Sequence, residues 1–408
     1  SILYHIMVNG HRFPALYVRD FRLFLFGQMI SLSGTWMHSV AQGWLIYSLT
    51  KSPLHLGIIA SLSSLPILIF TLWGGIVADR YPKRNILILT QILSMFPAII
   101  IALFTDMEII TIWHVAMTAL VLGTINAFDI PARQAFLAEV VSKADITNAI
   151  ALNSAAFNGA RIIGPLIAGF IISSLGISAC FYLNAISFIP VILALRKIKA
   201  KGVLKTYQQG IFKSVKEGWQ FILRKRIILY IMLLISLFSL FGIPYITLLP
   251  VITGEILNRG AKEFSLLVAS AGAGSFTGAL IIAFKGEIKR KDIYILLPAF
   301  VFSFAIFGLS FSRNFYLSMF FVFIAGWGIV SFLATSNSLI QQIVTNELRG
   351  RIMSLYTLVF LGFAPIGNSI IGITAHIFGT IISLKILASI CIVGCIVFYR
   401  FIRKHSIN

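Results

Sequence analysis

The sequence predicts an all-α membrane protein with twelve transmembrane helices in two pseudo-symmetric six-helix bundles. Three observations predict this fold class: the composition, the number of long apolar runs and the placement of the cations. Hydrophobic residues occupy 58% of the 408 positions and charged residues only 11%, whereas about a quarter of the residues in a soluble domain are charged. Most of the chain is therefore expected to lie within a bilayer.

Twelve apolar runs are long enough to cross the bilayer, since each approaches the roughly 20 residues that a transmembrane helix needs. They cover residues 22–48, 54–78, 85–104, 109–130, 147–173, 176–195, 227–252, 264–284, 293–311, 315–340, 351–376 and 379–400. Residues 1–21 lack the basic start, apolar core and small-residue cleavage site of a signal peptide. We expect them to form a cytoplasmic lead-in.

The lysines and arginines predict the orientation of the chain, whose net charge is +20. They recur in short segments between apolar runs, which argues against nucleic-acid binding and favours membrane lipid headgroups as their partners. With both termini inside, 27 of the 33 cations fall in cytoplasmic segments and four in outside loops. Because cytoplasmic loops are enriched in cations, this ratio predicts an even number of spans and two cytoplasmic termini.

Ten of these cations lie in residues 196–226, which divide the spans six and six. The predicted units are a lead-in (1–21), an N-terminal bundle (22–195), a basic cytoplasmic linker (196–226), a C-terminal bundle (227–400) and a cytoplasmic tail (401–408). A shift of about 203 residues superimposes four glycine pairs, which are Gly75 and Gly278, Gly123 and Gly326, Gly164 and Gly367, and Gly169 and Gly372. Two repeats with a binding site between them are the simplest account.

The loop between the second and third spans has a distinctive charge pattern: Gly75, Asp79, Arg80, Lys83 and Arg84. Charged side chains next to hydrocarbon are costly unless they reach the interface, where cations face lipid headgroups and a carboxylate can pair. The loop is therefore expected at the cytoplasmic surface.

Polar side chains form stripes along several spans. The first span carries Gln28, Thr35, His38 and Gln42 on one helix face. Asn126 lies in the fourth span, and the tenth span carries Thr335, Ser338 and Gln342 at helical spacing. Such faces are expected to avoid lipid, although for single hydroxyl groups the alternative is a role in helix packing.

The fifth span contains both small residues and a charge. Gly164 and Gly169 permit close contact with a neighbouring helix, and Pro165 permits a bend. Asn158 and Arg161 share one face, with Arg161 about 20 Å from either end of the span. We expect Arg161 to bind substrate or its counter-charge; the alternative is that it ties backbone carbonyls of neighbouring helices together.

Two residues are candidates for carrying a coupling proton. Asp129 is the most deeply placed carboxylate, and His38 exchanges protons near neutral pH. For Asp129 the alternative is a structural ion pair with Arg80 or Arg84 across the ends of the second and fourth spans.

Several motifs together resemble the major facilitator superfamily. The Gly75 to Arg84 loop is similar to the conserved loop of that superfamily. Residues 33–37 (SGTWM), 128–136 (FDIPARQAF), 148–154 (NAIALNS) and 347–354 (ELRGRIMS) resemble the branch that contains the enterobactin exporter and macrolide efflux proteins. The resemblance covers nearly the whole chain.

The resemblance implies a secondary transporter, an exporter that works by alternating access, with the 75–84 loop as a conformational gate. It also implies that the first, fourth, seventh and tenth helices line a central cavity, so the polar stripes become substrate-cavity candidates. Small residues around Gly164, Pro165 and Gly169 resemble the antiporter pattern of the fifth helix. The fourth helix departs from the superfamily, because Ala119 stands where an arginine often precedes Gly123.

We therefore expect a monomeric exporter of small amphipathic molecules, such as siderophores or drugs, in a bacterial inner membrane, with proton antiport left open. A neutral or anionic substrate is favoured because the predicted cavity lacks acidic residues. The sequence contains neither a phosphate-binding loop nor a catalytic or metal-ligand spacing, so we expect no enzyme activity, cofactor or metal. The alternatives are a lysophospholipid flippase of the same fold and a non-transporting scaffold or sensor.

Overall fold

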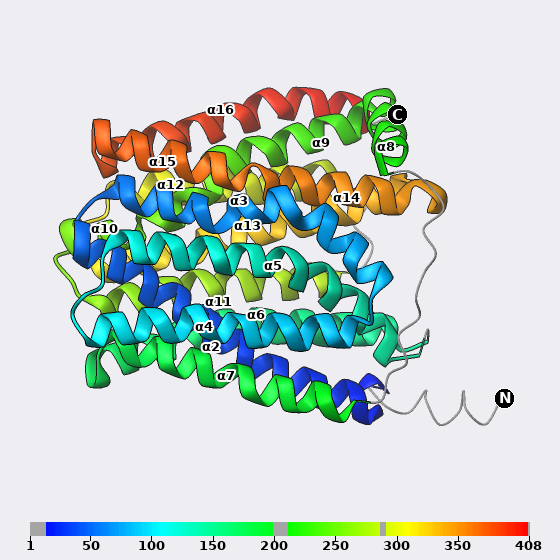
Figure 1. The fold of residues 1–408 in the computed structure, drawn as a ribbon. Helices are drawn as coiled ribbons and strands as arrows, with labels where there is room; N and C mark the ends of the chain where they lie inside the picture. The colour runs from blue at the N-terminus through cyan, green and yellow to red at the C-terminus, as the bar shows by residue number, and fades with distance from the viewer. Residues whose placement is uncertain (1–13, 143, 199–210, 286–290, 407–408) are drawn as a thin grey trace.

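The computed structural model describes residues 14–142, 144–198, 211–285 and 291–406. Every regular element in these ranges is helical, and most helices run side by side along the long axis of the bundle (Figure 1). Ten of the described helices are long and apolar enough to cross a membrane. The prediction of an all-α membrane protein is confirmed. The described residues leave out parts of the predicted lead-in (1–13), linker (199–210), loop before the ninth span (286–290) and tail (407–408).

The first group of helices follows the predicted spans closely. It comprises η1 (Pro14–Tyr17), α2 (Arg19–Thr50), α3 (Pro53–Arg80), α4 (Lys83–Asp106), α5 (Ile112–Val140), α6 (Ile146–Leu175) and α7 (Ile177–Lys197). Helix α2 is long enough to span but is not among the ten, because its polar stripe lowers its hydropathy. Lys51 ends α2 in a left-handed conformation (φ 49°), and Pro53 starts α3 at a position where its missing N–H is tolerated.

The second group begins with a helix that the sequence analysis did not predict. It comprises α8 (Ile211–Arg224), α9 (Arg226–Leu237), η2 (Phe238–Gly242), η3 (Ile243–Leu248), α10 (Leu249–Val251), η4 (Ile252–Ile256), α11 (Ala261–Lys285), α12 (Lys291–Leu309), α13 (Phe315–Ile343), α14 (Asn346–Gly362), α15 (Ala364–Phe378) and α16 (Thr380–Ser406). Helix α8 occupies part of the predicted linker. Helix α13 is capped by the Asn314 side chain, which accepts hydrogen bonds from the N–H groups of Tyr316 and Leu317.

Two of the expected spans are interrupted. The 227–252 run changes from an α-helix to π and 3-10 turns between Phe238 and Leu248, and the 351–376 run breaks between α14 and α15. Pro244 and Pro365 lie at these breaks, where proline removes a backbone donor and disturbs the helical ladder. Some backbone carbonyls at the breaks are bonded by side chains: Ser239 Oγ donates to the Phe360 carbonyl at 2.7 Å.

Three of the four predicted glycine pairs make equivalent contacts. Gly123 of α5 packs on the backbone of α3, and Gly326 of α13 packs in the same way on α11. Gly164 faces the Ser33 carbonyl of α2, and Gly367 faces carbonyls of η2. The third pair, Gly169 and Gly372, faces helices of the other group. These contacts support the proposed division into two repeats.

For the remaining pair, Gly75 and Gly278, the predicted position in α3 is wrong by one residue. Gly278 of α11 packs against α13, whereas a side chain at Gly75 of α3 would meet nothing within 4 Å. The contact that corresponds to Gly278 is made by Gly74, which packs against the backbone of α5 at Ala127 and Phe128. A helix rotates by about 100° per residue, so Gly74 and Gly75 face different directions.

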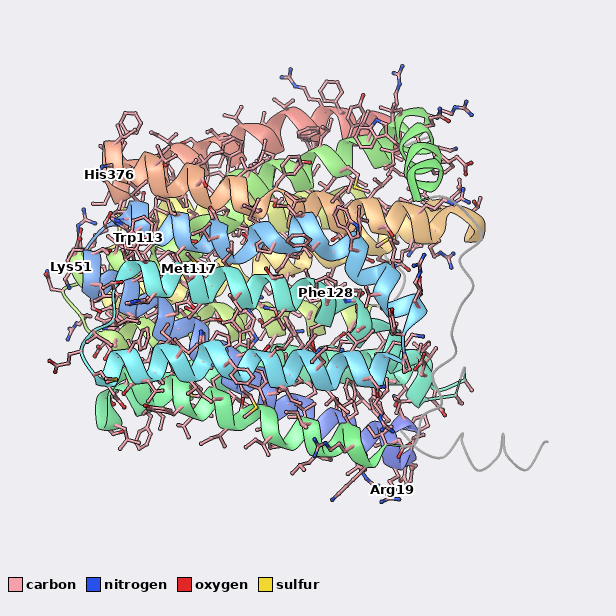
Figure 2. The ribbon with its side chains drawn as sticks, in the orientation of Figure 1. Arg19, Lys51, Trp113, Met117, Phe128 and His376 are labelled. Atoms are coloured by element: carbon pink, nitrogen blue, oxygen red, sulfur yellow. The ribbon has the colours of Figure 1, made fainter. Side chains whose placement is uncertain are left out.

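Contacts between the two groups close one end of the bundle. At Gly57 of α3, a Cβ atom would lie 2.7 Å from the Gly372 Cα atom of α15. Trp44 of α2 stacks on Phe264 of α11 with ring centroids 5.9 Å apart. This is the end that carries Lys51 and His376, and Arg19 lies at the other end (Figure 2). We call the end with Arg19 and the α3–α4 connection the basic end.

Replacement of Gly164 by alanine is expected to destabilise the N-terminal bundle. A Cβ atom there would lie 2.6 Å from the Ser33 carbonyl oxygen, and such overpacking costs about 1–3 kcal/mol. Gly159→Ala on the same helix is the matched control, because a Cβ atom at Gly159 would meet nothing within 4 Å. Thermal unfolding in detergent should show a lower Tm for Gly164→Ala alone; equal Tm values for both variants would contradict this packing.

Candidate substrate site

A cavity of about 1040 Å³ lies between the two groups of helices. Its walls come from all six helices of the first group, from the broken segment around η3, and from α11 and α15. At the closed end it is bounded by Phe264 and Pro250, and toward the basic end it extends to Arg133 and Leu137. The cavity is therefore asymmetric, with most of its wall supplied by the first group.

Carboxamide side chains give this cavity its chemical character. Nine of them contribute to the wall: Gln28, Gln42, Gln91, Asn126, Gln134, Asn153, Asn158, Asn184 and Asn368. Amides donate and accept hydrogen bonds without carrying charge. Such a wall suits a polar or amphipathic ligand.

Seven of the ten predicted cavity residues line this space, and three do not. The seven are Gln28, Thr35, His38, Gln42, Asn126, Asn158 and Arg161. The expectation for Thr335, Ser338 and Gln342 is corrected, because these residues of α13 are not part of the cavity wall. Helix α13 packs against α11 and α12, which buries Thr335, and Gln342 donates a hydrogen bond to Ser338 on its own helix.

Arg161 brings a positive charge into the cavity at the middle of α6. Its guanidinium lies over the ring of Trp36 on α2, 5.4 Å from the centroid. Among the described residues it forms no ion pair. An arginine at this depth costs at least about 2.5–3.5 kcal/mol on insertion scales, and a cation–π contact offsets about 0.5–2 kcal/mol. The site therefore has capacity to bind an anion.

His38 is held as a neutral ring. Its Nε2 atom is 3.1 Å from Gln42 Oε1, and its Nδ1 atom is 3.2 Å from Asn184 Nδ2 on α7. The Asn184 amide can only donate through that nitrogen, so Nδ1 accepts and Nε2–H donates to Gln42. Protonation of Nδ1 would break the contact with Asn184, and in this arrangement His38 links α2 to α7.

Asp129 forms an ion pair, but with a different partner from those predicted. Its Oδ2 atom is 2.6 Å from Arg133 Nη2, one turn further along α5. Its Oδ1 atom accepts hydrogen bonds from Thr90 Oγ1 at 2.7 Å and Gln91 Nε2 at 2.9 Å. The expected pairing with Arg80 or Arg84 is corrected, because donors on α4 and α5 already surround the carboxylate. Asp129 and Arg133 also line the cavity, so the expectation of a cavity without acidic residues is wrong, although Arg133 balances this carboxylate.

The predicted gating residues make most of their contacts within the first group. Lys83 forms a buried ion pair of 2.7 Å with Glu139, and Arg84 donates to the Ile198 carbonyl at 2.8 Å. Arg80 is exposed, and Asp79 forms no ion pair in the part of the chain that the structure describes. The α3–α4 connection thus presents an uncommitted carboxylate at the basic end.

Several residues of the cavity wall were not predicted from the sequence. Asn184 and Asn368 lie in spans where no polar stripe was recognised, and Gln91 lies in the third span. Asn368 accepts a hydrogen bond from Thr247 Oγ1 at 3.2 Å, which joins the two broken helices. Pro244 and Pro365 could have indicated Asn368, because a proline within an apolar run marks a helix break, and binding sites form at such breaks.

The fold and the cavity between two helix groups define a membrane transporter of small molecules. The family model of transmembrane secretion effectors matches residues 12–406, so the chain belongs to that family of the major facilitator superfamily. It is 26% identical to the staphyloferrin A transporter of Staphylococcus aureus over 397 residues, which cover 94% of this chain and 96% of the relative. It is 20% identical to macrolide efflux protein A of Streptococcus pyogenes, over 84% of this chain and 85% of the relative.

Solved transporter structures share the fold at lower identity. A bacterial homologue of the human lysosomal transporter Spinster, in an inward-facing and unoccupied conformation, superposes with a TM-score of 0.75 at 12% identity. The match covers 95% of this chain and 96% of that one. A transporter of the POT family in complex with 5-aminolevulinic acid superposes with a TM-score of 0.74 over 95% and 97% of the two chains.

Asp129→Asn is expected to lower stability, because the new amide group would face donors on Thr90, Gln91 and Arg133. Breaking a buried ion pair by removing one partner costs about 3–5 kcal/mol. The double variant Asp129→Asn with Arg133→Gln should recover part of the loss, since it leaves no unpaired charge. Thermal unfolding measures the stability of the single and the double variant. A stable Asp129→Asn protein whose transport loses its pH dependence would instead identify Asp129 as a proton carrier.

Proposed function

We propose that this protein exports small amphipathic molecules bearing an anionic group across a bacterial inner membrane by alternating access. The observation that carries the proposal is Arg161, a cation in the cavity with no ion-pair partner among the described residues. Its attraction for an anion is strong where water is scarce. Amide groups around it supply hydrogen bonds for the remainder of the molecule.

The relatives support this class of substrate. One is named for a siderophore and another for macrolide efflux, which supports a small amphipathic substrate, whereas the anionic group is inferred from Arg161 alone. In this proposal the basic end faces the cytoplasm, as the cation distribution favours. The cavity would then take up its substrate from the cytoplasm and release it after the closed end opens.

Substitutions of Arg161 test substrate recognition. Arg161→Gln is expected to weaken binding of carboxylate siderophores about ten- to hundredfold while leaving their neutral methyl esters little changed, since charge-assisted hydrogen bonds contribute about 1.5–3 kcal/mol. Arg161→Lys should retain part of the binding, because it keeps the charge but loses the planar fork. Binding to protein in nanodiscs and transport in everted vesicles measure these effects.

Lys385→Gln is the matched control for Arg161. Lys385 is also a cation within a span, but its Nζ atom lies 4.1 Å from the Phe311 ring centroid, and Lys385 does not line the cavity. Its substitution should leave the preference for anions unchanged. A lower Tm for Arg161→Gln with unchanged binding of acids and esters would make Arg161 a structural tie. Transport of labelled lysophospholipid in preference to the acids would instead favour a lipid flippase.

Asp79→Asn is expected to slow transport more than it weakens binding. Asp79 lies on the last turn of α3 at the basic end and not in the cavity wall, so its carboxylate is available to pair when the two groups approach each other there. Ligand affinity in detergent should stay within about twofold, while the transport rate falls at least about tenfold if roughly 1.4 kcal/mol of a conformational step is lost. Equal loss of affinity and rate would remove the gating role.

A further inference from the structure

Helix α8 crosses the basic end of the bundle instead of running along it. In Figure 1 it is seen almost along its axis, whereas α9 and α14 beside it lie lengthwise. Two contacts hold it against α14. The Glu217 carboxylate forms an ion pair with Arg351, and a Cβ atom at Gly218 would lie 3.0 Å from the Leu355 side chain.

The described part of α8 has one buried face and one exposed apolar face. Gly218 and Ile222, four residues apart, are buried against the bundle. Trp219 and Leu223, also four apart, are 46% and 50% exposed. A helix with this pattern that lies across the end of a membrane bundle is suited to the interface, where its exposed apolar residues enter the acyl chain region.

A cluster of cations adjoins the exposed apolar face. Arg224, Lys225 and Arg226 follow one another from the end of α8 to the start of α9, and all three are exposed. Among the described residues none of them forms an ion pair, because the nearby Glu217 is engaged by Arg351. Within the described part of the chain, the cluster therefore presents three unpaired cations that directly follow Leu223 in the sequence.

A pair of aromatic residues lies one helical turn from this cluster. Tyr230, one turn into α9, stacks on Phe401 near the end of α16, with ring centroids 5.0 Å apart. Aromatic rings gather at the depth of lipid headgroups because one edge is apolar and the other tolerates water. Because Tyr230 follows Arg226 by one turn, this pair favours a place for the cluster near the headgroup layer.

We propose that α8 and the start of α9 form a binding site for an anionic phospholipid, separate from the substrate cavity. The cations at 224–226 bind the phosphate of the headgroup, and Trp219 and Leu223 contact its acyl chains. A neutral zwitterionic lipid fits less well, because its choline group would meet the same cations. Each Lys or Arg near an anionic surface contributes a factor of about five in affinity.

Fluorescence quenching by brominated lipids tests this site. The full chain is reconstituted in phosphatidylcholine nanodiscs that contain a small fraction of brominated phosphatidylglycerol or, in parallel, brominated phosphatidylcholine. The difference between the wild-type protein and Trp219→Phe gives the signal of Trp219. We expect the phosphatidylglycerol probe to quench this signal at least about fivefold more efficiently than the phosphatidylcholine probe.

Two variants assign the selectivity to its residues. The triple variant Arg224→Gln, Lys225→Gln, Arg226→Gln should be quenched equally by both lipids, whereas Arg313→Gln, in the α12–α13 connection near the opposite end, should behave as wild type. Equal quenching of wild-type Trp219 by both probes would overturn the anionic site, because α8 would then lie in lipid without recognising the headgroup. No quenching by either probe would show that Trp219 faces protein or water.

Discussion

Arg161 is a half-buried cation at the middle of α6, in the wall of the cavity between the two groups of helices. Arg161 has a stacking contact with Trp36 but no ion pair with any described residue, so part of the insertion cost of its charge remains uncompensated. The protein tolerates this because the charge faces a cavity and not lipid. In the proposed function, an anion that enters the cavity would offset the remaining cost of this charge.

Contacts between the two groups of helices close the cavity at the end that carries Lys51, and the cavity extends from there toward the basic end. Close helix contact across the interface needs small residues, and Gly57 with Gly372 supplies it at the closed end. The breaks at Pro244 and Pro365 allow polar groups such as Asn368 to face the cavity. In lipid, irregular backbone is tolerated only where protein or a cavity satisfies it.

Sequence reasoning found the helical architecture because composition, span length and cation placement are each governed by the bilayer. The polar face of α2 in the cavity wall was also predictable, since Gln28, His38 and Gln42 repeat at helical spacing. It failed where tertiary packing decides. Thr335 has the same spacing, yet α13 turns it into the protein interior, and Asp129 pairs with the local Arg133 and not with distant arginines. Helix α8 was missed because its cations dominated the linker pattern.

A structure of the protein with a carboxylate substrate bound would show directly whether Arg161 binds the anionic group. We expect a carboxylate oxygen about 2.7–2.9 Å from a guanidinium nitrogen of Arg161, the length of a charge-assisted hydrogen bond. Amide groups of the cavity wall should contact the polar groups of the same molecule. The proposed role of Arg161 would be wrong if the substrate carboxylate lay elsewhere in the cavity while the guanidinium remained over the Trp36 ring.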